Sequence, residues 1–145
     1  MLGNQHEVRQ MKRVVITGAG TVNALAPDVA GTFAAFREGR CGIGPLDIRD
    51  RDRLFSSIGA QVRHWLPEAH FTRQQLLIYD RFTQFAVASA RQAIAQSGLD
   101  FDTPLGNETG VIIGTAGGGV NTADESYRAV YEEKKNRVHP FVVPR

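Results

Sequence analysis

The stretch Arg13-Val-Val-Ile-Thr-Gly-Ala-Gly20 decides the fold, because it joins a short apolar run to a glycine turn. Val14, Val15 and Ile16 are consecutive β-branched residues, which favour a strand that is buried on both faces. The glycines that follow permit backbone angles that other residues avoid. A second copy of the pattern, Gly110-Val-Ile-Ile-Gly-Thr-Ala-Gly-Gly-Gly119, stands near the other end of the sequence. The two copies predict an α/β fold in which buried strands run into glycine turns and then into helices.

The composition is that of a soluble domain of ordinary charge. At 145 residues, the chain is long enough for one domain with its own core. The 17 Lys and Arg residues, against 15 Asp and Glu, are scattered along the sequence, which argues against a nucleic-acid partner. The single cysteine excludes a disulfide framework within the chain and fits a reducing compartment. No apolar run approaches the roughly 18 residues of a membrane span, so we expect a cytoplasmic protein with no membrane partner.

The first ten residues, 1–10, are polar and lack the apolar core of a secretory signal. They are interpreted as an N-terminal extension or tag, because Met11-Lys12-Arg13 reads like a natural start. The folded domain is therefore expected to span residues 11–145.

Two helices and a strand are predicted in the first half of the domain. A helix should start at Pro27-Asp28 and end at Gly39, with an apolar face made by Val29, Phe33 and Phe36. Residues 40–45 are rich in glycine and proline and predict a loop. Residues 58–62 suit a short strand at a sheet edge, and residues 72–79 suit a short helix.

The clearest predicted helix follows Asp80, which can act as its cap, and ends at Gly98. Its apolar positions recur at helical spacing and are Phe82, Phe85, Ala86, Ala90, Ala93 and Ile94. Thr122-Ala-Asp-Glu125 has the spacing of a capping box. It predicts the start of a helix with Ala123, Tyr127, Val130 and Tyr131 turned inward.

The glycine turns leave two interpretations open. The first turn resembles a dinucleotide-binding fingerprint, but Asn23 stands where that fingerprint has its third glycine. A short-chain dehydrogenase pattern would need glycines at Val22 and Ala24. The second turn lacks the Lys-Ser/Thr of a phosphate loop. The other interpretation is steric, since glycine lets a strand end pass close to another backbone or to a buried ligand.

No catalytic or metal site can be recognised from spacing. Cys41 lies in a predicted loop without a histidine beside it, so a structural or incidental thiol is favoured over a nucleophile. The four histidines form no Cys/His cluster and no i, i+4 pair; they are His6, His64, His70 and His139. His64, Trp65 and His70 fall in an irregular stretch and are interpreted as surface residues. We expect no metal and no nucleotide cofactor.

Five motifs together resemble the N-terminal part of the β-ketoacyl-acyl-carrier-protein synthases in order and spacing. They are residues 13–20, Phe36-Arg-Glu-Gly-Arg-Cys-Gly-Ile43, Tyr79-Asp-Arg-Phe-Thr-Gln-Phe-Ala86, residues 110–119 and His139-Pro-Phe-Val-Val-Pro144. Arg37-Glu-Gly-Arg40 with Gly44-Pro-Leu46, and Arg73-Gln-Gln-Leu76, are similar to the rhizobial nodulation branch of these condensing enzymes. The resemblance covers residues 11–145.

The resemblance implies a thiolase-like, layered α/β/α/β/α fold, of which this chain would be an incomplete N-terminal half. Such enzymes are usually homodimers. They take an acyl chain from the phosphopantetheine of acyl carrier protein onto a cysteine, decarboxylate a malonyl thioester and join the carbanion to the acyl group. The chemistry needs a thiolate near a helix N-terminus and two histidines that stabilise the oxyanion and the enolate.

None of these three residues is expected in the chain. In the family, the nucleophile follows the segment that matches Pro140 to Pro144, and both histidines lie further on. Cys41 matches a loop position where the family commonly has serine. The sequence also ends on an apolar stretch that normally packs against something, so we expect an inactive N-terminal fragment of a longer enzyme.

Two substrate-binding positions are carried over by the resemblance. Gly117 matches a site that lines the acyl pocket, and Val142 matches a position that reaches the acyl pocket of the partner subunit. Both are small here, which indicates room for a longer or bulkier chain, although backbone packing alone also explains them. Two other functions stay open: a non-catalytic partner subunit that resembles a chain-length factor, and a nucleotide-binding oxidoreductase.

Overall fold

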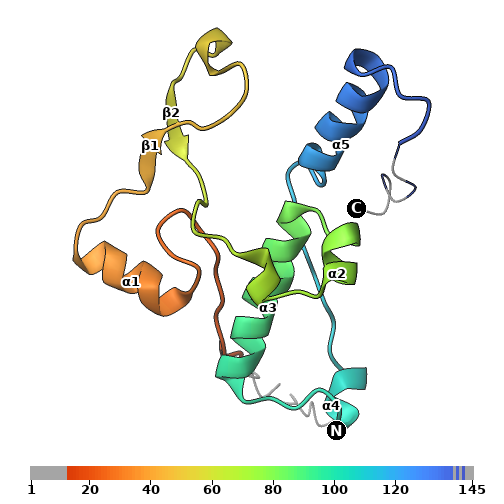
Figure 1. The fold of residues 1–145 in the computed structure, drawn as a ribbon. Coiled ribbons are helices and arrows are strands. Elements are labelled where there is room, and N and C mark those ends of the chain that lie inside the picture. Colours follow the sequence, from red (N-terminus) through yellow and green to blue (C-terminus); the bar gives the residue numbers. More distant parts are fainter. Residues whose placement is uncertain (1–12, 139, 141, 143–145) are drawn as a thin grey trace, which may run out of the picture.

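Helix α3 (Arg81–Ser97) is the central element, and the other elements are arranged around it (Figure 1). The computed structural model describes residues 13–138, 140 and 142. Along this part follow α1 (Val29–Arg37), β1 (Ile43–Pro45), the 3-10 turn η1 (Arg51–Arg53), β2 (Ile58–Ala60), the 3-10 turn η2 (Pro67–Ala69), α2 (Arg73–Ile78), α3, α4 (Pro104–Asn107), α5 (Val120–Tyr127) and the π-helical turn η3 (Arg128–Glu132). The predicted extension over residues 1–10 lies outside the described residues, as does most of the apolar stretch after Val138.

Helix α1 forms where it was predicted, and its cap is local. The Asp28 side chain accepts a hydrogen bond of 2.6 Å from the Gly31 N–H, which satisfies one of the free amides of the first turn. Gly39 follows the helix at φ 64°, a left-handed angle that glycine adopts without strain. The predicted apolar face is not covered by the described residues, because Phe33 and Phe36 are both more than half exposed.

A small antiparallel hairpin is the only sheet among the described residues. Strand β2 confirms the strand predicted near Ile58, and it pairs with β1 so that Gly44 lies opposite Gly59. Strand β1 lies inside residues 40–45, where the sequence predicted only a loop. The glycines and proline suit it because a two-stranded ribbon leaves both of its strands at an edge.

Helices α2 and α3 follow one another beside the core. Thr72 and Gln75 form a reciprocal capping box at the start of α2, which confirms the short helix predicted there. Helix α3 starts after Asp80 and ends at Gly98, whose φ is 66°, as predicted. The Asp80 side chain does not cap α3 itself, however, and its actual partner is described below.

The hydrophobic core lies where the residues on both sides of η2 pack against the first half of α3. Trp65, Phe71 and Ala88 are buried there, and Phe85 packs against Trp65 edge to face with ring centroids 5.3 Å apart. The interpretation of Trp65 as a surface residue was therefore wrong. The ring of His70, which is exposed, stacks on Trp65 at 4.5 Å. Within the predicted apolar stripe of α3, Ala90 and Ile94 are exposed, because the core reaches only one end of the helix.

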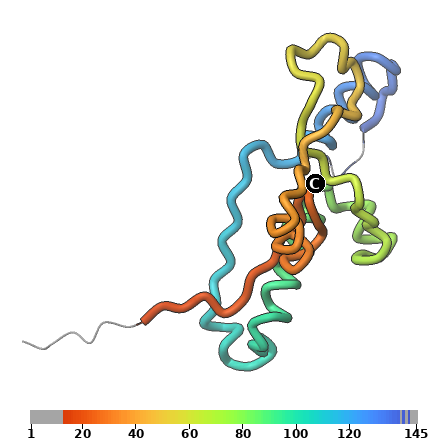
Figure 2. The backbone as a smooth tube through the Cα atoms, turned by 90° about the vertical axis from the view of Figure 1, so that its left-hand side faces the viewer, coloured from red at the N-terminus to blue at the C-terminus, as the bar shows by residue number. Residues whose placement is uncertain are grey.

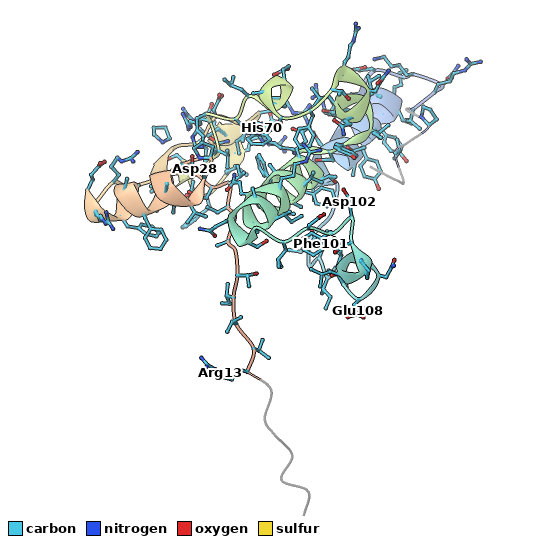
Figure 3. All side chains as sticks on the ribbon, turned by 90° about the horizontal axis from the view of Figure 1, so that it is seen from below. Arg13, Asp28, His70, Phe101, Asp102 and Glu108 are labelled. Carbon is cyan, nitrogen blue, oxygen red and sulfur yellow. The ribbon has the colours of Figure 1, made fainter. Side chains whose placement is uncertain are left out.

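The predicted buried strands are extended but neither paired nor buried. Val14 and Ile16 are 95% and 93% exposed, and Ile112 is 98% exposed. The segment that begins at Arg13 runs away from the helices (Figure 3), and residues 109–114 cross from α4 to α5 as extended chain (Figure 2). A strand exists only through its hydrogen-bonded neighbours, and the described residues offer none to either segment. The α/β fold is thus confirmed only in part by this structure.

Residues 18–21 pass directly against the backbone of α3. A Cβ atom on Gly18 would stand less than 3.0 Å from the carbonyl oxygen of Ala93, and one on Gly20 would be equally close to that of Ser89. The amide of Thr21 donates to the Gln92 side chain at 3.1 Å. The glycines are therefore required by a close approach of two backbones, which confirms the steric interpretation of this turn.

The surface area shows how open the arrangement is. The chain exposes 12337 Å², whereas a compact monomer of 15.9 kDa would expose about 7400 Å². Apolar side chains contribute to the excess, since the two extended segments and the aromatic residues of α1 and α5 are exposed. Tyr127 and Tyr131, predicted to turn inward, are both exposed and stack on one another at 6.1 Å.

Candidate functional site

The glycine-rich loop over residues 114–119 leads into helix α5 and carries the first predicted binding residue, Gly117. The Gly118 amide donates to the Thr115 hydroxyl at 3.1 Å, and Gly118 has φ 60°. Gly117 is exposed, and an added Cβ there would meet the Val120 side chain at 3.0 Å. The conformation of the loop thus depends on glycine at 118, and a side chain at position 117 would press on Val120.

Val142, the second predicted binding residue, is half buried and lies against the far end of α5. It lines an apolar cavity of about 260 Å³ together with Ala123, Tyr127, Val130 and Tyr131. Gly117 does not line this cavity. The described structure therefore does not bring Gly117 and Val142 into one site, and their role as substrate-binding residues stays a prediction.

The first turn of α5 is held by a residue from another helix. The backbone amide of Thr122 donates to Oδ2 of Asp80 at 2.9 Å, and its hydroxyl donates to the same oxygen at 2.5 Å. The N-cap residue of α5 is Gly119, which has no side chain with which to cap. The predicted capping box of Thr122 and Glu125 was therefore wrong. Thr122 bonds across to Asp80 at the start of α3, 42 residues earlier in the sequence.

Both members of this pair are buried, with Asp80 4% and Thr122 4% exposed. Burial alone would raise the pKa of the Asp80 carboxyl, but the hydrogen bonds from the hydroxyl and amide of Thr122, aided by the nearby backbone N–H groups of Phe82 and Arg81, lower it below its ordinary value. The carboxylate is thus held in its ionised form. It is the only carboxylate that is buried in the part of the chain that the structure describes.

An open cleft of about 1000 Å³ lies between the hairpin, the start of α3 and α5, and Asp80 and Thr122 stand in its wall. Charged side chains of both signs line it: Asp47, Arg63, Arg81, Asp124, Glu125 and Arg128. Arg63 and Arg81 each donate to a backbone carbonyl of the hairpin region, those of Pro45 and Val62. The cleft thus brings charged side chains of several elements together, with the Asp80–Thr122 pair in its wall.

We expect the contribution of Asp80 to stability to depend on pH. Its pKa is lowered on folding, so its ionised form contributes stability that is fully present above the unfolded pKa of 3.8 and is lost as pH falls through the lower folded value. Asp80→Asn should therefore lower the free energy of unfolding by roughly 1 kcal/mol near neutral pH. The difference from wild type should vanish at low pH, where the protonated carboxyl resembles the amide. Urea unfolding of both proteins across the acid range checks this.

The other ionisable groups of the cleft are present in both proteins, so their contributions to the free energy of unfolding cancel in that comparison. A difference between wild type and Asp80→Asn that stays constant down to about pH 2 would contradict a lowered pKa.

Neither a thiol site nor a metal site is visible in the described residues. Cys41 is exposed, and within the described residues its sulfur forms hydrogen bonds only with the backbone of Ile43. No group of three or more His, Cys, Asp or Glu side chains in this part of the chain could hold a metal ion. None of its helices has the length and apolar character needed to cross a membrane.

Sequence comparison places the chain beside known proteins over nearly its whole length. A family model described as the N-terminal domain of β-ketoacyl synthase matches residues 11–145. Nodulation protein E of Rhizobium sp. (strain N33) is 37% identical over 92% of this chain and 33% of its own length. The 3-oxoacyl-[acyl-carrier-protein] synthase 2 of Staphylococcus aureus (strain COL) is 31% identical over 93% of this chain.

A solved structure shows the same fold. The ishigamide ketosynthase/chain length factor matches 90% of this chain with a TM-score of 0.73 at 23% identity, and the match takes in 33% of that protein. The chain therefore spans about a third of the length of the relatives that it matches.

Proposed function

The chain belongs to the β-ketoacyl synthase family, whose N-terminal domain it matches from residue 11 to residue 145, and we propose that it forms the N-terminal part of a condensing enzyme. The complete enzyme would transfer an acyl group from carrier-protein phosphopantetheine to a cysteine thiolate. Loss of CO₂ from malonyl-carrier protein would then generate the carbanion that attacks the acyl thioester, which releases the cysteine and yields a β-ketoacyl thioester. Its partners would be acyl carrier protein and a second, similar subunit, in the cytoplasm.

The family match carries this proposal, and the exposed apolar segments of the structure support it. The apolar segments 14–16 and 111–113 are mostly exposed, and the total surface is far above that of a compact chain of this mass. Both features are expected of one part of a larger layered α/β/α/β/α fold, in which further strands and helices cover these segments. We therefore propose that residues 11–145 are the first part of a thiolase-like domain.

The nucleophile and the two histidines would be supplied by the rest of the enzyme. Cys41 is the only cysteine of the chain, and within residues 13–138 no histidine ring is among its hydrogen-bond partners. A catalytic thiol is ordinarily activated by a neighbouring base or by a helix N-terminus. The present residues would contribute walls of the acyl site instead, with Gly117 and Val142 as the proposed contacts.

The test is a condensation assay with acyl- and malonyl-carrier protein. The full-length protein should release CO₂ and form the β-ketoacyl product, while the 145-residue chain alone should form none. Cys41→Ser in the full-length protein should leave the rate unchanged. Product formation by the 145-residue chain, or loss of activity in Cys41→Ser, would show that the nucleophile is assigned wrongly.

A second candidate is a non-catalytic partner subunit, because the matched solved structure is named as a ketosynthase with its chain length factor. In that case, the full-length protein alone would not condense. Addition of a catalytic partner would restore the reaction and set the product length. The coding sequence beyond Arg145 separates the two candidates: a cysteine flanked by alanine or serine soon after Pro144 favours the enzyme, and another residue in its place favours the partner.

A further inference from the structure

The link between Asp80 and Thr122 joins the starts of two helices, α3 and α5. One carboxylate oxygen accepts both the amide and the hydroxyl of Thr122, and both residues are 4% exposed. Hydrogen bonds to a buried, ionised carboxylate are the strong members of their class. Thr122 is the third residue of α5, so its amide is one of those that have no partner within the helix.

The glycine-rich loop depends on this link for its position. Thr122 lies three residues after Gly119, the last residue of the loop, and no side chain within α5 caps the helix. Added Cβ atoms at Gly114 and Gly118 would meet nothing within 4 Å, so the loop has few neighbours of its own. Its C-terminal end is fixed to α3 by the bonds from Thr122 to Asp80.

We infer that Asp80 is a positioning residue that fixes the glycine-rich loop 114–119 and thereby sets the acyl-chain preference of the enzyme. This inference rests on the proposed function, because Gly117 lies on that loop and is the proposed wall of the acyl site. A shift of α5 relative to α3 would move Gly117 with it. The residue would act through Thr122 and the loop, without touching the substrate.

Three variants of the full-length protein test the inference. Asp80→Ala removes the acceptor, Thr122→Val removes the hydroxyl donor and keeps the amide, and Thr122→Ser keeps both donors. Asp28→Ala is the matched control, because it removes another aspartate that caps a helix, at α1.

Hydrogen exchange of residues 114–122 reports the anchoring without any need for activity. Asp80→Ala and Thr122→Val should speed exchange there by about tenfold, and Thr122→Ser should behave as wild type. Asp28→Ala should speed exchange only in α1. Unchanged exchange of residues 114–122 in both Asp80→Ala and Thr122→Val would overturn the anchoring.

The ratio of kcat/KM for a long and a short acyl-carrier protein reports the positioning. A merely structural role would lower both values alike, through the amount of folded enzyme, and leave their ratio unchanged. Displacement of the loop should change the ratio by about tenfold or more in Asp80→Ala and Thr122→Val, with recovery in Thr122→Ser. A ratio equal to that of wild type in both variants overturns the positioning role. If wild type itself does not condense, the proposed function fails, whereas the exchange data still decide the anchoring.

Discussion

Replacement of Gly20 with alanine is expected to lower the free energy of unfolding by about 3 kcal/mol or more, at the upper end of the range for overpacked sites. The new Cβ would fall within 3.0 Å of the carbonyl oxygen and carbon of Ser89, which belong to the backbone of α3. Because helical backbone cannot turn aside as a side chain can, the whole segment must move away from α3. That movement also breaks the hydrogen bond from the Thr21 amide to Gln92.

Gly44→Ala is the matched control for this variant. Gly44 lies in strand β1 with nothing within 4 Å of an added Cβ, and its φ is not left-handed. Its stability should change by less than about 0.5 kcal/mol. Chemical denaturation of the three proteins measures both values. Equal, small effects in the two variants would mean that residues 18–21 do not pack on α3.

Trp65→Ala is expected to have the second large effect, with a loss of about 3–5 kcal/mol. Trp65 is 7% exposed and contacts the rings of Phe71 and Phe85. Its indole N–H also donates to the Gln84 side chain at 2.9 Å. Truncation would leave a cavity in the core and remove the partner of Gln84, two separate costs to the folded state.

Phe55→Ala separates burial from the chemistry of an aromatic side chain. Phe55 is fully exposed in the hairpin turn, at 109% of its reference surface. Its truncation should leave the free energy of unfolding within about 0.5 kcal/mol of wild type. Thermal melting curves of wild type, Trp65→Ala and Phe55→Ala measure the two losses of stability. A stable Trp65→Ala protein would show that the cluster around this residue is not the core.

The sequence predicted local features well because their causes are local. The start of α1, the short helix α2 and the end of α3 at Gly98 each depend on residues within one turn. Capping residues and helical periodicity determine such features. The family was recognised from motifs in register, and the comparisons confirm it over residues 11–145.

Features that depend on distant partners could not be predicted in the same way. Apolar β-branched runs indicated buried strands at 14–16 and 111–113, but burial requires neighbours that the described chain does not contain. Thr122 carried a local capping pattern, yet its amide and hydroxyl donate hydrogen bonds to Asp80, which precedes α3. Asp80 was recognised only as a helix cap, since no signal in the sequence relates two residues 42 positions apart. Trp65 was misplaced because two of its core partners, Phe85 and Ala88, come from α3.

The unpaired segments 14–16 and 111–113 bear on how fast and how safely this protein folds. Nearly a hundred residues separate the two runs, and pairing over such distances is slow, because loop-closure entropy is lost before any contact stabilises the chain. Until other strands pair with them, both runs expose unpaired backbone groups and uncharged, β-branched side chains to other molecules. Such edges recruit further chains into intermolecular sheets. Folding yield in this protein should therefore be governed by how quickly these two edges are covered.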